Sequence, residues 1–182
     1  MRKSYLGWSV VIAALTLLTA GPALAQAFPP TSFLTPTKAT WESTRGLVLG
    51  IAEIIPEDKY DFRPTPNVRT TRENLIHLIG ENYFFFTKVS GDPLPSADRL
   101  KELKTRDEIM KELRASYDYG AKVWDTLTEA KAQELVEGRN NQRVQRWSFI
   151  LGAIQDNMNH YGNLVVYLRL NGIVPPRSAS RS

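Results

Sequence analysis

The chain has 182 residues, about the length of one domain, and 42% of them are apolar, so it has enough material for a stable core. Its 23 basic and 19 acidic residues are interleaved instead of forming a stripe, which argues against a nucleic-acid partner. The absence of cysteine excludes disulfides, a thiol nucleophile, thiolate metal ligands and a lipoprotein anchor. Any metal ligands must therefore come from His, Asp, Glu or neutral oxygen donors.

The N-terminus has the three-part form of a secretory signal. Arg2 and Lys3 precede an apolar run over residues 6–20, which is followed by a Gly-Pro pair and by small residues around Ala25. We therefore predict a signal peptide over residues 1–25 and a secreted or periplasmic mature protein without a stable membrane anchor. An uncleaved anchor is the alternative, but the apolar run is short for a span of about 20 residues. Loss of the two basic residues leaves 21 against 19 acidic ones, so the sequence pI of 9.4 overstates the basicity of the mature chain.

The mature chain is predicted to be helical after an extended leader. Residues 26–37 hold three prolines and few periodic apolar positions, so we expect this leader to lie on the surface. Beyond it, apolar residues recur at intervals of three and four, which is typical of amphipathic helices. The predicted helices are residues 38–55, 71–90, 105–137 and 144–170.

The predicted helix ends carry recognisable stop and start signals. Pro56 ends the first helix and opens a proline-rich loop. Thr70 or Thr71 can cap the second helix, with Glu73 completing a capping box. A Gly-Asp-Pro sequence ends the second helix, and Asn171 followed by glycine ends the fourth.

No segment of the sequence indicates a strand. The third predicted helix counts Leu135 in its apolar stripe, and the fourth counts Leu151 and Met158 among its inward-facing residues. Four amphipathic helices joined by one long connection predict an all-α fold, a four-helix bundle over residues 38–176. Residues 177–182 are predicted to be a disordered tail.

The chain has only two histidines, and each lies among apolar residues in the middle of a predicted helix. Either one could be a core histidine bonded to a neighbour. However, Asp156 precedes His160 by four residues, so both side chains stand on one face of the helix and can reach a common point. With His77 from the second helix, they form a candidate three-ligand metal site.

Two imidazoles and one carboxylate suit several divalent ions. The arrangement is the one used by iron(II), and zinc or nickel would also fit. Glu73 and Glu81 flank His77 by four residues on either side and are candidates for outer partners or substitute ligands, with helix capping or surface exposure as the alternative. Asn163, one turn after His160, could orient water or substrate. The catalytic residues themselves are not identifiable.

Several common catalytic motifs are missing from the sequence. Neither GxxxxGK[ST] nor GxGxxG is present, so a phosphate-binding loop is not supported. The GxSxG motif of a nucleophile elbow is absent, as is the HExxH motif of zinc proteases.

Two stretches carry a resemblance to a known family. IPEDKYDFRPTPNVRTTRENLIHLIGENYFFF and DNMNHYGNLVVYLRLNGIVPPRS resemble the DinB family of four-helix proteins, which are grouped with the YfiT-like metalloenzymes. The resemblance covers about residues 41–178. It implies a bundle with up-down-down-up connectivity and a divalent metal held by three histidines. His77 matches the first ligand and His160 the last, but Asp156 stands where the family has a histidine.

The resemblance also bears on activity. Some relatives transfer or isomerise low-molecular-weight thiol adducts, which implies a metal-activated thiol or water as the nucleophile. We therefore expect an exported, divalent-metal-dependent enzyme of hydrolase or transferase type, acting on a small molecule. A non-catalytic bundle with a degenerate site, which binds a small ligand or is structural and stress-associated, is the alternative. A homodimer is also expected from bundles of this kind.

Overall fold

The computed structural model describes residues 32–179. The predicted signal peptide lies outside these residues, as do the first half of the predicted leader and the last three residues of the tail. Within the described part, the long helices are α1 (Leu34–Glu53), α2 (Thr71–Ser90), α4 (Arg106–Thr126) and α6 (Trp147–Leu170). The short helices are η1 (Glu57–Lys59), α3 (Asp98–Lys101), α5 (Glu129–Gln133), η2 (Arg139–Asn141) and α7 (Pro176–Ala179).

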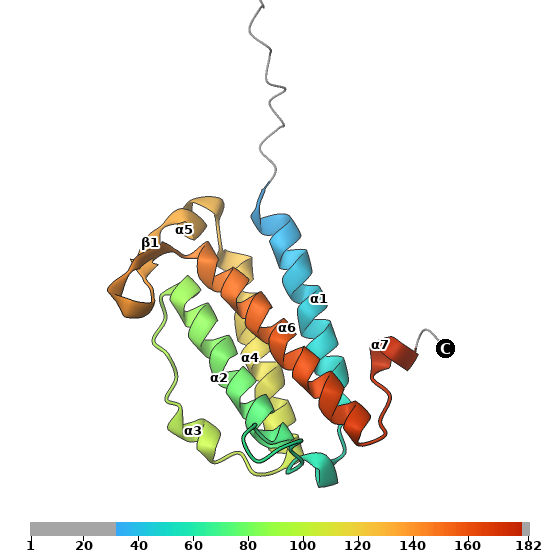
Figure 1. The fold of residues 1–182 in the computed structure, drawn as a ribbon. Coiled ribbons are helices and arrows are strands. Elements are labelled where there is room, and N and C mark those ends of the chain that lie inside the picture. The colour runs from blue at the N-terminus through green and yellow to red at the C-terminus, as the bar shows by residue number, and fades with distance from the viewer. Residues whose placement is uncertain (1–31, 180–182) are drawn as a thin grey trace, which may run out of the picture. The chain divides into compact units, whose positions relative to one another are not determined.

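The four long helices form the predicted bundle, with up-down-down-up connectivity (Figure 1). Helix α2 packs against α4 and α6, and α1 packs against the same two helices on the other side. The long connection through α3 returns the chain to the other end of the bundle, so α2 and α4 run in the same direction. Helix α6 runs opposite to α2 and lies beside it, which is the pairing that builds the candidate site. No helix in residues 32–179 has the length and apolar character needed to cross a membrane.

Helix α1 begins four residues earlier than the sequence predicted. The structure places Leu34 at its first position, so the end of the predicted leader is helical and not extended. Pro36 does not prevent this because a proline in the first turn removes only an N–H that has no partner within the helix. Thr37 strengthens this turn by donating its hydroxyl to the Phe33 carbonyl at 2.8 Å.

Helix α2 matches its predicted bounds and caps. The Thr70 hydroxyl accepts from the Glu73 N–H at 3.1 Å, and the Glu73 carboxylate accepts from the Thr70 N–H at 2.6 Å. These two bonds form the predicted capping box. At the other end, Gly91 adopts a φ of 91°, a left-handed conformation that ends the helix.

The predicted third helix was wrong beyond residue 126. Leu127 is extended, and the Thr128 hydroxyl caps a new short helix, α5, by accepting from the Lys131 N–H. Strands β1 (Leu135–Glu137) and β2 (Arg143–Gln145) then form an antiparallel hairpin, although no strand was predicted. Leu135 is exposed and not part of a helical stripe.

Helix α6 starts three residues later than predicted because strand β2 takes the chain up to residue 145. Its end is as predicted: Gly172 has a φ of 74°, and the N–H groups of Gly172 and Ile173 donate to the carbonyls of Arg169 and Leu168. Two residues predicted to face inward, Leu151 and Met158, are exposed.

In the core, Gly120 of α4 packs against aromatic side chains of α1 and α2. Trp41 is completely buried, and its ring contacts Phe86 and Tyr117 at centroid distances of 5.3 and 6.3 Å. A Cβ added at Gly120 of α4 would come within 2.8 Å of Trp41 and 3.0 Å of Phe86. Gly120 therefore allows α4 to approach these rings closely.

The C-terminal segment was predicted to be disordered from residue 177. The structure instead places residues 176–179 in the short helix α7, whose first turn is closed by N–H groups of Ser178 and Ala179 donating to the Pro175 carbonyl. A proline at the first helical position is compatible with this turn because its missing N–H would have no partner there.

Candidate metal centre

The three predicted ligands come together in the contact between α2 and α6. The imidazole rings of His77 and His160 meet edge to face, with centroids 4.9 Å apart. His160 Nε2 lies 3.6 Å from an Asp156 carboxylate oxygen, as the four-residue spacing on α6 predicted. One ligand atom from each of the three side chains lies within 4.8 Å of the other two.

These separations are wider than those around a coordinated ion. Ligand atoms that each lie about 2.0–2.2 Å from a tetrahedral zinc ion are about 3.3–3.6 Å apart. The three atoms lie within 4.8 Å of one another, so the side chains would have to move closer together to bind an ion.

The tautomer of His160 is fixed by Asn74. His160 is buried, and its Nδ1 lies 3.0 Å from the Asn74 side-chain oxygen. Because an amide oxygen only accepts hydrogen bonds, Nδ1 must carry the proton. In the neutral ring this leaves a lone pair on Nε2, the nitrogen that faces Asp156. Such a hydrogen bond on the far nitrogen is the usual way in which proteins orient a metal-binding imidazole.

Asp156 has a buried carboxylate oxygen without a hydrogen-bond donor. The Oδ2 atom is shielded from solvent and has no hydrogen-bond partner among the described residues. Its other oxygen faces the lone pair of His160 Nε2, so two acceptors point at each other. A buried acceptor without a partner is costly. The residues present therefore fit a divalent cation, which would satisfy both groups at once.

His77 is kept in the form that can bind a metal. Its pKa is lowered, first by burial and then by the positive charge of Arg69. Near neutral pH the ring is therefore uncharged and has a lone pair to donate. His77 can therefore bind a metal ion at that pH without first losing a proton.

The other two candidate ligands lie outside the cluster. Glu73 is held in the capping box, so its carboxylate stabilises the start of the helix. The cluster of possible metal ligands found in the described residues does not include Glu81.

Sequence reasoning missed the buried amides around the site. Asn74 holds His160, and Asn157, next to Asp156, donates to Asn82 at 2.9 Å and to the Ala153 carbonyl at 2.9 Å. The Tyr117 hydroxyl donates to the Asn157 oxygen. This network ties α2, α4 and α6 together beneath the ligands. Its sequence signal was asparagine at helical positions whose neighbours at intervals of three and four are apolar.

Two surface depressions flank the metal centre. The first has a volume of about 640 Å³ and is formed by loop residues between Pro64 and Arg69 together with Asn74, Asn163 and Tyr167. The second, of about 420 Å³, includes Asp156 in its lining. Asn163 therefore lies where the sequence predicted, one turn from His160 and beside a space that a substrate could occupy.

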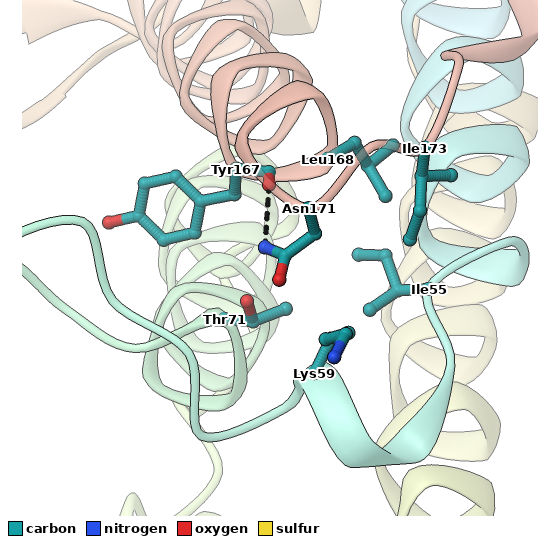
Figure 2. A pocket seen from close by; sticks show the side chains of 7 residues that line it. All are labelled: Ile55, Lys59, Thr71, Tyr167, Leu168, Asn171 and Ile173. Carbon is teal, nitrogen blue, oxygen red and sulfur yellow. Dashed lines mark hydrogen bonds between the residues drawn. The ribbon is translucent and has the colours of Figure 1, made fainter.

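A third pocket, shown in Figure 2, is too small to bind a substrate. Its volume of about 10 Å³ is at the lower limit for one water molecule. The side chains of Ile55, Leu168 and Ile173 face it, and the Asn171 amide donates to the Tyr167 carbonyl beside it. It is a packing gap where the end of α6 meets the end of α1.

Comparison with known proteins agrees with the fold. A DinB superfamily model matches residues 40–164. A DinB-like protein from Bacillus subtilis has a similar structure, with a TM-score of 0.62 and 20% identity, covering 75% of this chain and 92% of that protein. A conserved protein from Enterococcus faecalis also has a TM-score of 0.62, with 16% identity, covering 77% of this chain and 97% of that one. A search among curated proteins found no match. Because the family model spans more than half of the sequence, this protein is a member of the DinB superfamily.

Proposed function

We propose that the protein is an exported enzyme that depends on a divalent metal held by His77, Asp156 and His160. The observation that carries this proposal is the shielded Asp156 oxygen without a partner, beside a histidine nitrogen whose lone pair faces the same carboxylate. A purely structural polar cluster would be expected to satisfy these acceptors internally, as the neighbouring Asn157 does.

The donor set is compatible with zinc, nickel or iron(II). When bound, such an ion supplies a Lewis acid that lowers the pKa of a water or thiol nucleophile. The three side chains leave coordination positions unfilled, since structural zinc sites use four protein ligands and catalytic sites use three. The reaction proposed is a hydrolysis or a group transfer.

The residues of this chain have distinct roles in the proposal. His77 and His160 donate neutral nitrogens, and Asp156 contributes the negative charge. Asn74 orients His160 and so acts through it as a positioning residue. The depression beside Asn74 and Asn163 would hold a small-molecule substrate next to the centre.

The decisive experiment is elemental analysis of the mature protein and of two variants, His160→Ala and Asp156→Ala. We expect about one equivalent of metal in the parent protein and a large loss in both variants. Asp125→Ala is a suitable control because this carboxylate is exposed and forms an ion pair with Lys38 of α1. Metal well below one equivalent in the parent, or equal content in all proteins, would contradict the proposal.

One observation favours the alternative, a non-catalytic bundle with a degenerate site. His160 is hydrogen-bonded to Asn74 and packed against His77, contacts that a structural polar cluster would also make. In that case Asp156→Ala would leave metal content unchanged, and small apolar ligands would stabilise the protein instead of metal ions.

We also propose that the chain is exported and cleaved after Ala25, on the basis of the signal-like composition of residues 1–25. Expression of the full chain in a bacterium, followed by fractionation and N-terminal sequencing, tests this. Mature protein beginning at Gln26 in the periplasm or medium is expected. Uncleaved protein in the cytoplasmic fraction would contradict it.

A further inference from the structure

The larger depression beside the metal centre has a distinct charge pattern. Among the described residues that line it, Arg69 is the one with a charged side chain, and the others are neutral. No acidic side chain takes part in the lining. The depression is therefore a neutral, polar surface with a single cation at its edge.

The guanidinium of Arg69 has no partner in residues 32–179, in contrast to its neighbours along the chain. Arg63 contacts the Glu73 carboxylate at 3.4 Å, and Arg72 contacts Asp61 at 3.0 Å. Neither an ion pair nor a side-chain hydrogen bond is formed by Arg69 in this part of the protein. Arginine presents a planar set of donors that matches a carboxylate, so an unpaired arginine at a depression is suited to bind one.

The backbone that carries Arg69 is anchored to the bundle. The Tyr167 hydroxyl of α6 donates to the Arg69 carbonyl at 2.7 Å. The Tyr167 ring also packs edge to face on Phe62, with centroids 5.9 Å apart. The loop is thus held against α6 at this residue, and the depression is formed before any ligand binds.

Asn74 connects this depression with the metal centre. Its side chain is 3% exposed, its oxygen accepts from His160, and it also lines the depression. The amide nitrogen of Asn74 makes no hydrogen bond within residues 32–179, so its two protons remain for a ligand.

We propose that this depression binds the carboxylate of a short organic acid, with Arg69 as the charged contact and the Asn74 and Asn163 amides as neutral donors. The assignment of this acid as the substrate class rests on the proposed function, but the binding itself does not. Asn163 lies one turn of α6 from His160, a rise of about 5.4 Å. The acid would therefore have a few bonds between its carboxylate and the reacting atoms.

A carboxylate fits this charge pattern better than a phosphate does. One guanidinium balances one negative charge, whereas phosphate carries up to two near neutral pH. The N-terminus of α2, which could otherwise attract a phosphate, is already occupied by the carboxylate of Glu73 in the capping box. The negative charge of Glu73 near Arg69 further disfavours a dianion.

The test is titration of metal-free protein with propionate, followed by NMR of the Arg69, Asn74 and Asn163 side-chain signals. The metal is removed with a neutral chelator, because a chelator bearing carboxylates would compete. We expect millimolar binding of propionate, none of propionamide, and weaker binding of inorganic phosphate. Arg69→Gln should weaken propionate binding by about tenfold or more, since it removes a charge-assisted contact.

Two further variants make the outcome specific. Arg63→Gln is the matched control, because Arg63 lies in the same loop but does not line the depression, and it should leave the affinity unchanged. His160→Ala should also retain propionate binding. Melting temperatures of the variants close to that of the parent establish that they are folded.

Three results would overturn the carboxylate proposal. The first is no propionate binding up to high millimolar concentrations, or equal affinity in the parent and Arg69→Gln. The second is phosphate binding as tight as propionate. The third is propionate binding that appears only with added zinc and disappears in His160→Ala, which would make the acid a metal ligand. Zinc content measured on the same proteins before the chelator is added tests the metal centre separately, so failure of one proposal is distinguishable from failure of the other.

Discussion

The side-chain oxygen of Asn74 lies 3.0 Å from Nδ1 of His160, and this contact decides which face of the imidazole is available to a metal. The two residues come from α2 and α6, and both are buried. Because the amide oxygen can only accept, the proton sits on Nδ1 and the lone pair on Nε2 is directed towards Asp156. Asn74, which is not among the three candidate ligands, would thus orient one of them.

Replacing Asn74 tests this role. Asn74→Leu should lower zinc affinity by about 10- to 100-fold, whereas Asn74→Asp keeps the acceptor and should retain binding. Calorimetric titration measures the affinity, and ¹⁵N NMR of the imidazole reports whether Nδ1 of His160 still carries the proton. Asn159→Leu on the exposed side of α6 serves as the control. Unchanged affinity and tautomer in Asn74→Leu would show that Asn74 only fills space.

Replacement of the Asp156 carboxylate should have opposite effects on metal binding and on the stability of the metal-free protein. Asp156→Leu should abolish metal binding but make the metal-free protein more stable, by about 1 kcal/mol, because it removes a shielded oxygen without a partner. Urea denaturation of both proteins after metal removal measures the difference. A less stable variant would indicate that Asp156 stabilises the fold even in the absence of an ion.

A histidine at position 156 should also support binding. Asp156→His keeps a ligand at the same place on α6, one turn before His160, and restores the three-histidine set that the family resemblance implies. We expect about one equivalent of zinc in this variant. Asp156→Asn is the comparison, since an amide is a weaker ligand, and it should bind less metal than either. Loss of zinc in the histidine variant would mean that the site requires the carboxylate's charge.

Gly120 packs against aromatic rings, so a larger side chain at this position should destabilise the fold. Gly120→Ala should destabilise the protein by about 1–3 kcal/mol, because its methyl group would overlap the rigid rings of Trp41 and Phe86. Gly46→Ala in α1 is the matched substitution, since nothing lies near its added methyl group. It should stabilise the helix by about 0.5–1 kcal/mol. Thermal or urea denaturation of both variants checks the opposite signs.

The capping box predicts a pH-dependent contribution to stability. The Thr70 N–H donates to Glu73 and lowers the pKa of that carboxyl below its ordinary value of 4.5. A group whose pKa is lowered by folding stabilises the folded state above that value, and the contribution is lost as the pH falls through the folded pKa. Glu73→Gln should therefore be less stable than the parent at pH 7, and the difference should shrink at pH 3. A constant difference would argue against the charge effect.

The sequence was sufficient to predict α2 and the three residues that meet between α2 and α6. Local chemistry specifies both: a threonine cap with an acid three residues later, a terminal glycine, and a carboxylate four residues before a histidine. The approach of His77 to this pair followed from the family resemblance and the bundle it implies. The ligand set was therefore predicted at the level of residues, but its distances came only with the structure.

The segment between α4 and α6 was not predictable in the same way. Residues 127–145 contain alanine, glutamate and leucine with helix-like spacing, yet Thr128 competes by capping a new helix. Pairing of Val136 with Val144 then depends on a turn in which Asn140 and Asn141 adopt positive φ angles. Strand pairing is a non-local interaction, so the spacing of apolar residues along one segment does not reveal it.

The faces of α6 illustrate a second difficulty. The helix is apolar on more than one side, so the sequence does not tell which side is buried. Leu151 and Met158 were assigned to the core, but Asn157 and His160 occupy it. Polar residues gained these places because Tyr117, Asn82 and Asn74 supply their hydrogen bonds.

The ligands come from only two helices, and these lie in distant parts of the chain. A cation shared by α2 and α6 would act as a removable cross-link, closing a long loop of the polypeptide in the folded state alone. Unfolding would have to release it, so the melting temperature should rise with the concentration of free ion. When free metal ion is scarce, the contact between α2 and α6 would lose this cross-link and become less stable.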